Sequence, residues 1–263
     1  MFKGFPVFAP EPVRANDGYP AEDFERLFEV EADHFWFRSR NRLLAWAFRK
    51  YFSGAGNFFE VGCGTGFVMS GFQREFPDLV LGGGDIFVEG LLFAQQRLGS
   101  VSLIQMDALS IPFEDEFDVM GLFDVLEHID EDETALKRVY RAIKPGGGVL
   151  ITVPQHPALW SAIDDYSFHK RRYTKKELTT KLKRAGFLIM RTTSFVSFLI
   201  PLRMASRIRQ RISPRGFDPY SELNVGTVLN SFLENVLMAE YLLIKAGLSL
   251  PKGGSLLAVA QKP

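Results

Sequence analysis

The sequence predicts an α/β protein built on a doubly wound, seven-stranded, mostly parallel sheet, with an N-terminal helical arm and a helical insertion before the last strand. Three observations lead to this prediction. Short apolar runs alternate with helical stretches from residue 57 onward. A glycine-rich turn follows the first of these runs. The chain has 263 residues and is 46% hydrophobic, which suffices for one sizeable core.

Strands are predicted where the apolar runs are short and bounded by turns. Because helical stretches separate them, we expect parallel strands joined by right-handed crossovers. In chain order, with a short helix near 175–185 before the last two, the expected strands are 57–61, 79–84, 101–106, 117–122, 148–153, 187–195 and 255–261.

Helical periodicity lies on both sides of this core. Residues 21–51 carry apolar side chains at helical spacing, after an irregular start rich in Pro and Gly. A second, long helical segment separates the last two strands. The chain therefore divides into an N-terminal arm with helices (1–52), a ligand-binding core (53–195), a helical insertion or lid (196–254) and the final core strand (255–263).

Cysteine and histidine usage limits the kinds of site. The single cysteine, Cys63, excludes an internal disulfide and an all-cysteine zinc site, and it fits a reducing compartment. The four histidines are too scattered along the sequence for a spacing-based metal site, so no metal is predicted.

Targeting signals are not recognised in the sequence. The start of the chain lacks a basic stretch followed by an apolar run, and no uninterrupted apolar run reaches the length of about 18 residues that a spanning helix needs. We expect a cytoplasmic protein, and contact with the inner face of a membrane stays open.

Charge is unevenly divided between the two halves of the chain. Residues 1–134 hold 10 Lys and Arg against 24 Asp and Glu, and residues 135–263 hold 21 against 7, so the halves carry −14 and +14. This asymmetry indicates either a basic face for an anionic partner or two halves that neutralise each other. Nucleic acid is not expected as a partner, because no recognition motif occurs.

The segment 58–66 is typical of a buried strand that runs into a glycine-rich turn before a helix. Gly62, Gly64 and Gly66 allow the backbone to turn tightly and approach a ligand, and the helix N-terminus offers N–H groups to a carboxylate. A nucleotide site would have a similar turn, but the dinucleotide fingerprint needs a third glycine where Phe67 stands. The spacing after Glu60 is more typical of methyltransferases.

Two further acids end the next two predicted strands. Asp85 stands where a carboxylate can accept both ribose hydroxyls, and Ile86 beside it can pack on an adenine. Asp107, followed by Ala108, stands where an acid can accept the adenine amino group. Each acid alone could cap a helix. Ligands bind at the carboxyl ends of such strands, so acids grouped beside a glycine turn favour a shared ligand.

These blocks resemble the class I S-adenosylmethionine-dependent methyltransferases, in the type 11/12 group that includes the ubiquinone/menaquinone-biosynthesis enzymes. The matching blocks are 60–66, 84–86, 107–108, 117–128 and 143–148. The resemblance implies the Rossmann-like methyltransferase fold and S-adenosyl-L-methionine as cofactor. It also implies that the methionine part is held by Glu60, Gly62, Gly64, Gly66 and the backbone near Phe123, the ribose by Asp85 and the adenine by Asp107.

Two more stretches, 31–40 and 153–173, resemble a narrower bacterial-type branch of this group, and the resemblance carries no substrate with it. The second stretch follows the fifth strand, on the rim where a methyl acceptor must enter. Trp160, Tyr166 and Tyr173 could wall an acceptor pocket there. Arg171 and Arg172 could clamp a carboxylate or phosphate. Alternatively, 170–172 is a solvated turn and Tyr173 a packed residue.

Trp36 and Arg40 belong to the first of these stretches. They could form a lid over the cofactor and contact the acceptor, because helical spacing places them on one face. A tryptophan in the core is the equally simple interpretation.

The sequence predicts methyl transfer by in-line displacement from the sulfonium to an unidentified small-molecule or lipid-like acceptor, which we expect to be anionic. The enzyme would mainly supply positioning and desolvation. A base is needed only for a proton of high pKa, and His128 and His169 are the candidates. The alternatives are an aminopropyl transferase, whose rim should be acidic, and a non-catalytic cofactor-binding or membrane-associated assembly protein.

The insertion contains two apolar segments, within 194–212 and 225–250. The first ends in a series of arginines, and this combination is typical of a helix that lies in a membrane interface. The series comprises Arg203, Arg207, Arg209 and Arg211. Alternatively, the two segments pack on each other as a lid over the acceptor pocket or form a dimer contact.

Overall fold

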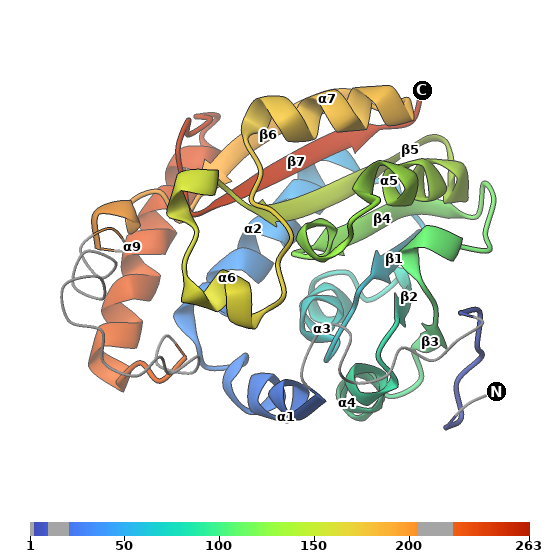
Figure 1. Ribbon diagram of the computed structural model, residues 1–263, viewed down its shortest axis with the longest axis horizontal. Coiled ribbons are helices and arrows are strands. Elements are labelled where there is room, and N and C mark those ends of the chain that lie inside the picture. Colours follow the sequence, from blue (N-terminus) through green and yellow to red (C-terminus); the bar gives the residue numbers. More distant parts are fainter. Residues whose placement is uncertain (1–2, 10–20, 203, 205–222) are drawn as a thin grey trace.

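A seven-stranded sheet runs through the centre of the computed structural model, which describes residues 3–9, 21–202, 204 and 223–263 (Figure 1). The strand order is β3-β2-β1-β4-β5-β7-β6, and β7 is antiparallel to both of its neighbours while the other pairs are parallel. The predicted fold class is confirmed. The strands are β1 (Asn57–Val61), β2 (Val80–Asp85), β3 (Ser102–Gln105), β4 (Phe117–Phe123), β5 (Ile143–Pro154), β6 (Leu188–Phe195) and β7 (Ser255–Gln261).

Helices cover both faces of the sheet (Figure 1). One apolar cluster joins the sheet to α2, α3, α4 and α9, and a second joins it to α5 and α7. β7 is buried along nearly its whole length because it is covered on both faces. The helices are α1 (Ala21–Val30), α2 (Phe35–Tyr51), α3 (Phe67–Glu75), α4 (Val88–Leu98), α5 (Asp132–Ala142), α6 (Ala162–Tyr166), α7 (Lys175–Ala185) and α9 (Thr227–Lys245), with short 3₁₀ turns η1 (Ala108–Ser110), η2 (Leu126–His128) and η3 (Pro157–Leu159).

The carboxyl ends of the parallel strands meet at one edge of the sheet. Val61 at the end of β1 is in register with Gly84 of β2 and Leu122 of β4. Asp85 at the end of β2 and the segments that begin at Gly62 after β1 and at Asp124 after β4 therefore lie at the same edge of the sheet. This edge is where ligands bind in open α/β sheets.

The observed helices differ from the predicted ones at two places. The predicted helical region 21–51 is interrupted at 31–34, where the His34 side chain accepts a hydrogen bond from the Trp36 N–H and caps α2. The polar segment after Pro154 contains α6, which begins with a capping box formed by Ser161 and Asp164. A helix of five residues is too short to produce a periodic apolar pattern, which explains why it was not predicted.

The described part of the insertion packs along α2. Leu233, Leu237 and Ile244 of α9 are buried, and Glu234 pairs with Arg42 of α2 at 3.1 Å. A role as a lid over the acceptor pocket stays a prediction. The arginines predicted to meet a membrane (Arg203, Arg207, Arg209 and Arg211) lie outside the described residues.

Candidate functional site

The glycine turn has the backbone conformation that its sequence predicts. Gly62, Gly64 and Gly66 have φ angles of +70°, +50° and +73°, and α3 begins directly after Gly66. A Cβ at Gly62 would lie 2.4 Å from Cγ2 of Val125, so the turn is also packed closely against the segment after β4. The turn is tied to β2, because the N–H of Gly62 donates to the carbonyl of Gly84 at 2.7 Å.

Asp85 links the end of β2 to this turn. One carboxylate oxygen accepts the N–H of Gly64 and the other accepts the N–H of Phe87, each at 2.8 Å. The side chain is buried, and burial raises its pKa to about 6. An ionised carboxylate offers about four acceptor positions, so each oxygen keeps capacity for a ribose hydroxyl. Ile86, which follows, is half-buried.

Glu60 and Asp107 occupy different environments. Glu60 of β1 is buried, its pKa is raised well above the usual range by that burial, and its Oε2 has no hydrogen-bond partner among the described residues. Asp107 ends β3 and caps η1 by accepting the N–H of Leu109 at 2.8 Å, with Ala108 buried behind it. Phe123 is the last residue of β4, and its ring is packed parallel to Phe58 in the core.

The N-terminal helix α1 covers the glycine turn, and the sequence did not predict this contact. The position of a Cβ at Gly64 would lie 3.9 Å from the ring of Phe24, which also packs on Phe87. Glu31, just after α1, accepts hydrogen bonds from Thr65 of the turn at 2.5 Å and from Arg97 of α4 at 2.7 Å. Phe24 thus covers the turn, and no local feature of the sequence around Phe24 indicated this contact.

Arg40 joins α2 to the segment that follows β4. Its guanidinium pairs with Asp124, the residue after β4, at 2.5 Å, and stacks on the ring of Trp36 at 4.5 Å. Asp124 adopts a φ of +58°, which directs the chain back across the end of the sheet. The positive charge of Arg40 counteracts the burial that raises the pKa of Glu60 and of Glu127.

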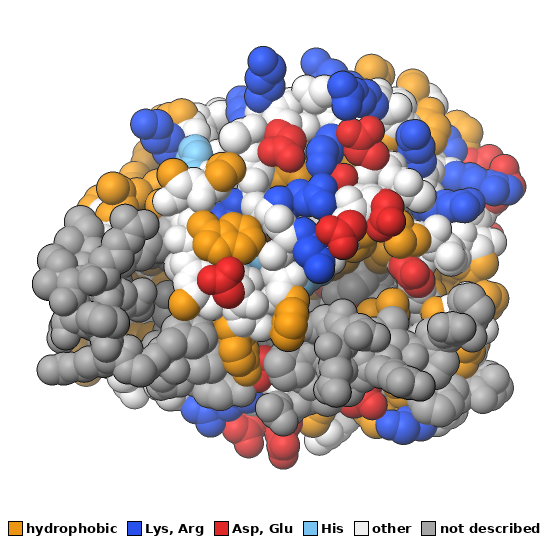
Figure 2. Space-filling model, viewed as in Figure 1, with side chains coloured by type: hydrophobic (Ala, Val, Ile, Leu, Met, Phe, Trp, Pro, Cys, Tyr) orange, Lys and Arg blue, Asp and Glu red, His pale blue; other side chains and the backbone are white. Residues whose placement is uncertain are grey.

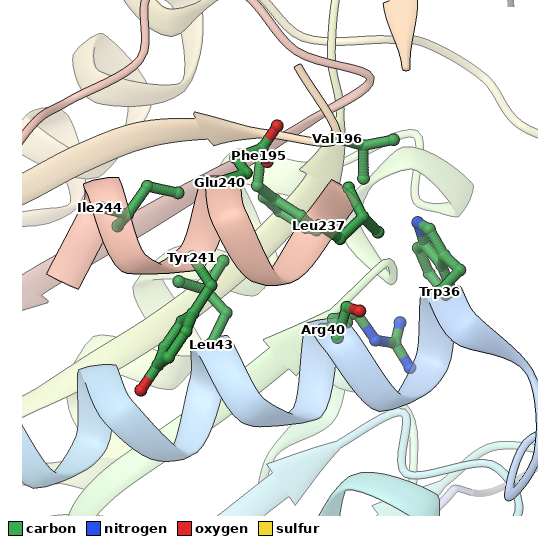
Figure 3. A pocket seen from close by; sticks show the side chains of 10 residues that line it. Trp36, Arg40, Leu43, Phe195, Val196, Leu237, Glu240, Tyr241 and Ile244 are labelled. Atoms are coloured by element: carbon green, nitrogen blue, oxygen red, sulfur yellow. The ribbon is translucent and has the colours of Figure 1, made fainter. Parts of the chain in front are cut away.

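Trp36 lines a small cavity between α2, the end of β6 and α9 (Figure 3). Its volume is about 20 Å³, which admits no more than a water molecule. This cavity is too small for an acceptor, so the contact of Trp36 with the acceptor stays a prediction. Arg40 and Tyr241 lie at the same cavity.

The predicted clamp of two arginines is wrong for Arg172. Its guanidinium is buried and bound in a bidentate way to Asp164, at 2.7 and 2.9 Å, so it is not available to an acceptor. Asp164 is fully buried; although burial raises its pKa, hydrogen bonds from His169 and Arg172 bring that pKa below the usual range. Arg171 remains partly exposed but pairs with Asp132 at 3.2 Å.

The predicted pocket wall is wrong for Tyr173, and for Trp160 it stays a prediction. Tyr173 is fully buried, and its hydroxyl donates to Asp132 at 2.5 Å, which makes it a core residue. Trp160 is half-buried and donates its indole N–H to Asp165 at 2.9 Å, on the outer side of α6. The sequence did not distinguish either side chain from a pocket residue, because Tyr173 contacts Asp132 of α5 and Trp160 contacts Asp165 of the short helix α6.

The two candidate bases lie together. The rings of His128 and His169 are 4.8 Å apart and nearly perpendicular, and Nδ1 of His169 is 2.8 Å from Asp164. Burial, aided by the neighbouring His169, lowers the pKa of His128 to about 3, so His128 is neutral at physiological pH and a weak base. Glu127 next to it is fully buried, and burial raises its pKa well above the usual range. The four histidines are scattered in the sequence, but the fold brings two of them together, and donor atoms of Glu127, His128 and His169 lie within 4.8 Å of one another.

Among the described residues, part of the opposite charge of the two halves is paired within the protein. Several basic residues of the second half pair with acids of the first half, and Figure 2 shows blue and red side chains interspersed over the centre of the visible face. The open question from the sequence is thus decided for these residues in favour of internal neutralisation. The pairs include Arg171 with Asp132, Lys181 with Asp132, Arg184 with Glu133, Lys144 with Asp118 and Lys262 with Asp115.

Sequence comparison relates part of the chain to known methyltransferases. Residues 59–151 match the family model of a methyltransferase domain. The chain is 32% identical over 119 residues to a ubiquinone/menaquinone biosynthesis C-methyltransferase of Pseudoalteromonas translucida, across 40% of this chain. The match spans about half (47%) of that relative's length.

Solved structures show the same fold. A phosphoethanolamine N-methyltransferase of Haemonchus contortus in complex with S-adenosyl-L-methionine is similar with a TM-score of 0.58 and 21% identity, over 85% of this chain and 52% of that chain. The [4+2]-cyclase SpnF is similar with a TM-score of 0.57 and 20% identity, over 87% and 83%. Because a cyclase shares the fold, the fold alone does not specify the reaction.

The seven-stranded order with an antiparallel last strand, and the glycine turn beside Asp85, define the class I S-adenosylmethionine-dependent methyltransferase architecture. Residues 59–151 match the model of a methyltransferase domain, and S-adenosyl-L-methionine is the cofactor that this match and the solved neighbours support.

Proposed function

We propose that the protein is an S-adenosylmethionine-dependent methyltransferase that acts on a small-molecule or lipid-like acceptor. The observation that supports this proposal most is the glycine turn held by the Asp85 carboxylate at the edge of the sheet. Side chains at Gly62 or Gly66 would overlap with Val125 or Leu98, so the turn keeps its backbone open to a ligand. When bound, the cofactor supplies an electrophilic methyl group on its sulfonium.

The residues of the chain would act by binding and positioning. Asp85 would accept the ribose hydroxyls, and the N–H groups at the start of α3 would face the methionine carboxylate. Phe24 of α1 would keep water from the cofactor. The anionic acceptor that the sequence suggested loses its main support, because Arg172 is paired within the protein.

The activity is tested with purified full-length protein, S-adenosyl-L-methionine and a metabolite or lipid extract. We expect formation of S-adenosyl-L-homocysteine that depends on the extract. Calorimetric binding of the cofactor without turnover in any extract would instead support a non-catalytic cofactor-binding protein.

Binding of S-adenosyl-L-homocysteine is expected to strengthen as the pH rises through about 6. Burial raises the pKa of Asp85 from 3.8 to about 6, and ribose hydroxyls donate to the ionised carboxylate. Below the raised pKa, affinity should fall by up to about tenfold per pH unit. The stability of the free protein changes with pH in the opposite direction. The folded state binds the Asp85 proton more tightly than the unfolded state does, so the contribution of Asp85 to stability falls as the pH rises between about 4 and 6.

The measurement is calorimetry from pH 5 to 8 on the wild-type protein and on Asp85→Asn. The asparagine variant should bind weakly and show no such pH dependence. Equal affinity of the wild-type protein at pH 5 and pH 8 would contradict a role for the ionised Asp85 carboxylate.

We further infer that α9 contacts a membrane surface, which would give access to a lipid-like acceptor and place the protein at the inner face of a membrane. Among the described helices, α9 has the length and composition of a membrane span, with only 22% of its apolar window buried. Its acids face the protein: Glu234 pairs with Arg42, and Glu240 accepts the N–H of Ser197. Its exposed side chains include the polar Ser231, Asn235 and Lys245. The exposed apolar ones are Val228, Leu229, Phe232, Leu242 and Leu243, with Phe198, Leu202 and Met204 exposed on the preceding segment.

Sedimentation with anionic liposomes tests this inference. We expect binding at low salt, weakened about tenfold or more in the double variant Val228→Ser and Phe232→Ser, because apolar contact with the lipid is lost. Val80→Ser is the matched control, since Val80 is an exposed apolar residue on β2. Absence of binding at low salt would discard the membrane contact, and binding unchanged after Arg203, Arg207, Arg209 and Arg211 are all replaced by Gln would discard its electrostatic part.

A further inference from the structure

Glu127, His128 and His169 meet near the carboxyl end of β4, and we propose that they bind a divalent transition-metal cation of the kind represented by Zn²⁺, Mn²⁺ or Co²⁺. One donor atom from each residue lies within 4.8 Å of the other two. Glu127 and His128 belong to η2, and His169 follows α6, so the fold brings together residues that are distant in sequence. Two imidazole nitrogens and one carboxylate form a donor set that such cations accept.

The Glu127 carboxylate is the main evidence for a bound cation, because it lacks a hydrogen-bond partner among the described residues. The side chain is fully buried, and neither oxygen accepts a hydrogen bond from another described residue. Two arginines are near enough to influence it, but Arg40 pairs with Asp124 and Arg172 pairs with Asp164. A buried carboxylate without a partner is energetically costly, and a bound cation would remove that cost.

Both imidazoles are held in orientation by groups behind them. Nδ1 of His169 contacts the buried Asp164 at 2.8 Å, which leaves Nε2 as the donor atom for a cation. Asp164 is itself fixed by Arg172 and by the N–H of Ser161 at 2.8 Å. His128 has a hydrogen bond with the backbone of Ser167. A carboxylate behind a histidine ligand is the usual arrangement at metal sites, because it fixes the tautomer and the ring orientation.

The size of the cluster fits a cation after a small adjustment. Ligand distances of about 2.0–2.2 Å place any two donor atoms no more than about 4.4 Å apart. Binding therefore draws the three donor atoms together from their separation of up to 4.8 Å by small side-chain rotations. Three protein ligands leave a coordination position open for water or for an oxygen of another molecule. This inference goes beyond the proposed methyl transfer and does not depend on it.

The test is a titration of chelator-treated, full-length protein with Zn²⁺, Mn²⁺ and Co²⁺, followed by calorimetry and, for Co²⁺, by visible absorption. We expect one cation per chain for at least one metal, together with a rise in Tm on metal addition. Glu127→Gln and His169→Asn should weaken binding at least about tenfold, as loss of a ligand does. His156→Asn is the matched control, because His156 lies in the neighbouring loop outside the cluster and its φ of +63° suits asparagine.

If His169→Asn folds poorly, the change in Tm of Glu127→Gln on metal addition still tests the proposal. Glu127→Gln preserves shape while it removes the carboxylate, so its Tm should no longer respond to metal. If no cation binds the wild-type protein, or if Glu127→Gln and His156→Asn bind metal equally well, the proposal is overturned and Glu127 is a buried protonated acid. The titration contains neither S-adenosyl-L-methionine nor an acceptor, so its outcome is independent of whether the protein transfers methyl groups.

Discussion

Arg172→Ala is expected to lower the free energy of unfolding by about 3–5 kcal/mol, because it leaves the buried Asp164 without its bidentate cation. Asp164 also caps α6 and contacts His169, so the loss extends to the loop that carries this histidine. Denaturant unfolding followed by circular dichroism gives the magnitude.

Arg171→Ala is the neighbouring control. The Arg171 side chain is 25% exposed and its pairs with Asp130 and Asp132 are 3.8 and 3.2 Å long, so its removal should cost no more than about 1 kcal/mol. Equal effects of the two substitutions would contradict the structural role of Arg172. An Arg172→Ala protein with unchanged stability and a raised KM for its acceptor would restore the arginine clamp.

Asp85→Ala is expected to weaken binding of S-adenosyl-L-homocysteine by about 1.5–3 kcal/mol, or about 10- to 150-fold. The substitution removes the ribose acceptor and also the two hydrogen bonds that hold Gly64 and Phe87 in place. Loss of the ribose acceptor weakens binding directly. Loss of the two hydrogen bonds weakens it indirectly, because they hold the turn in the shape that binds the ligand.

Calorimetry on Asp85→Ala and on Asp78→Ala measures this effect. Asp78 is exposed before β2, at the opposite end of the same strand, and its removal should leave affinity unchanged. Tight NAD binding without any response to S-adenosyl-L-methionine or S-adenosyl-L-homocysteine would overturn the assignment of the cofactor site.

The sheet and the cofactor edge were predictable because their signals are local. Two strands, 57–61 and 255–261, have the predicted bounds, since a short apolar run between turns permits little else. The positive φ angles at Gly62, Gly64 and Gly66 likewise follow from residue type and spacing. Asp85 comes directly after the glycines of β2, so its position at the sheet edge follows from its place at the end of that strand.

Side-chain partners from distant segments could not be predicted in this way. The resemblance to a narrower branch of the group singled out the stretches 31–40 and 153–173. It did not indicate which residues their side chains contact. Arg40 pairs with Asp124, and Glu31 pairs with Arg97, across separations that no periodicity encodes. The same limit applied to Phe24, whose position over the glycine turn depends on how α1 packs against α4.

The sequence by itself determined the α/β architecture, the glycine turn and the acids at the strand ends, because each depends on neighbours within a few residues. Only the tertiary structure decided that Arg172 and Tyr173 are internal, and that Glu127 and His128 meet His169. The physical reason is that burial and pairing of a charged side chain depend on α6, a helix too short to leave a periodic signal, and on which chain segments the parallel strands bring to a common edge.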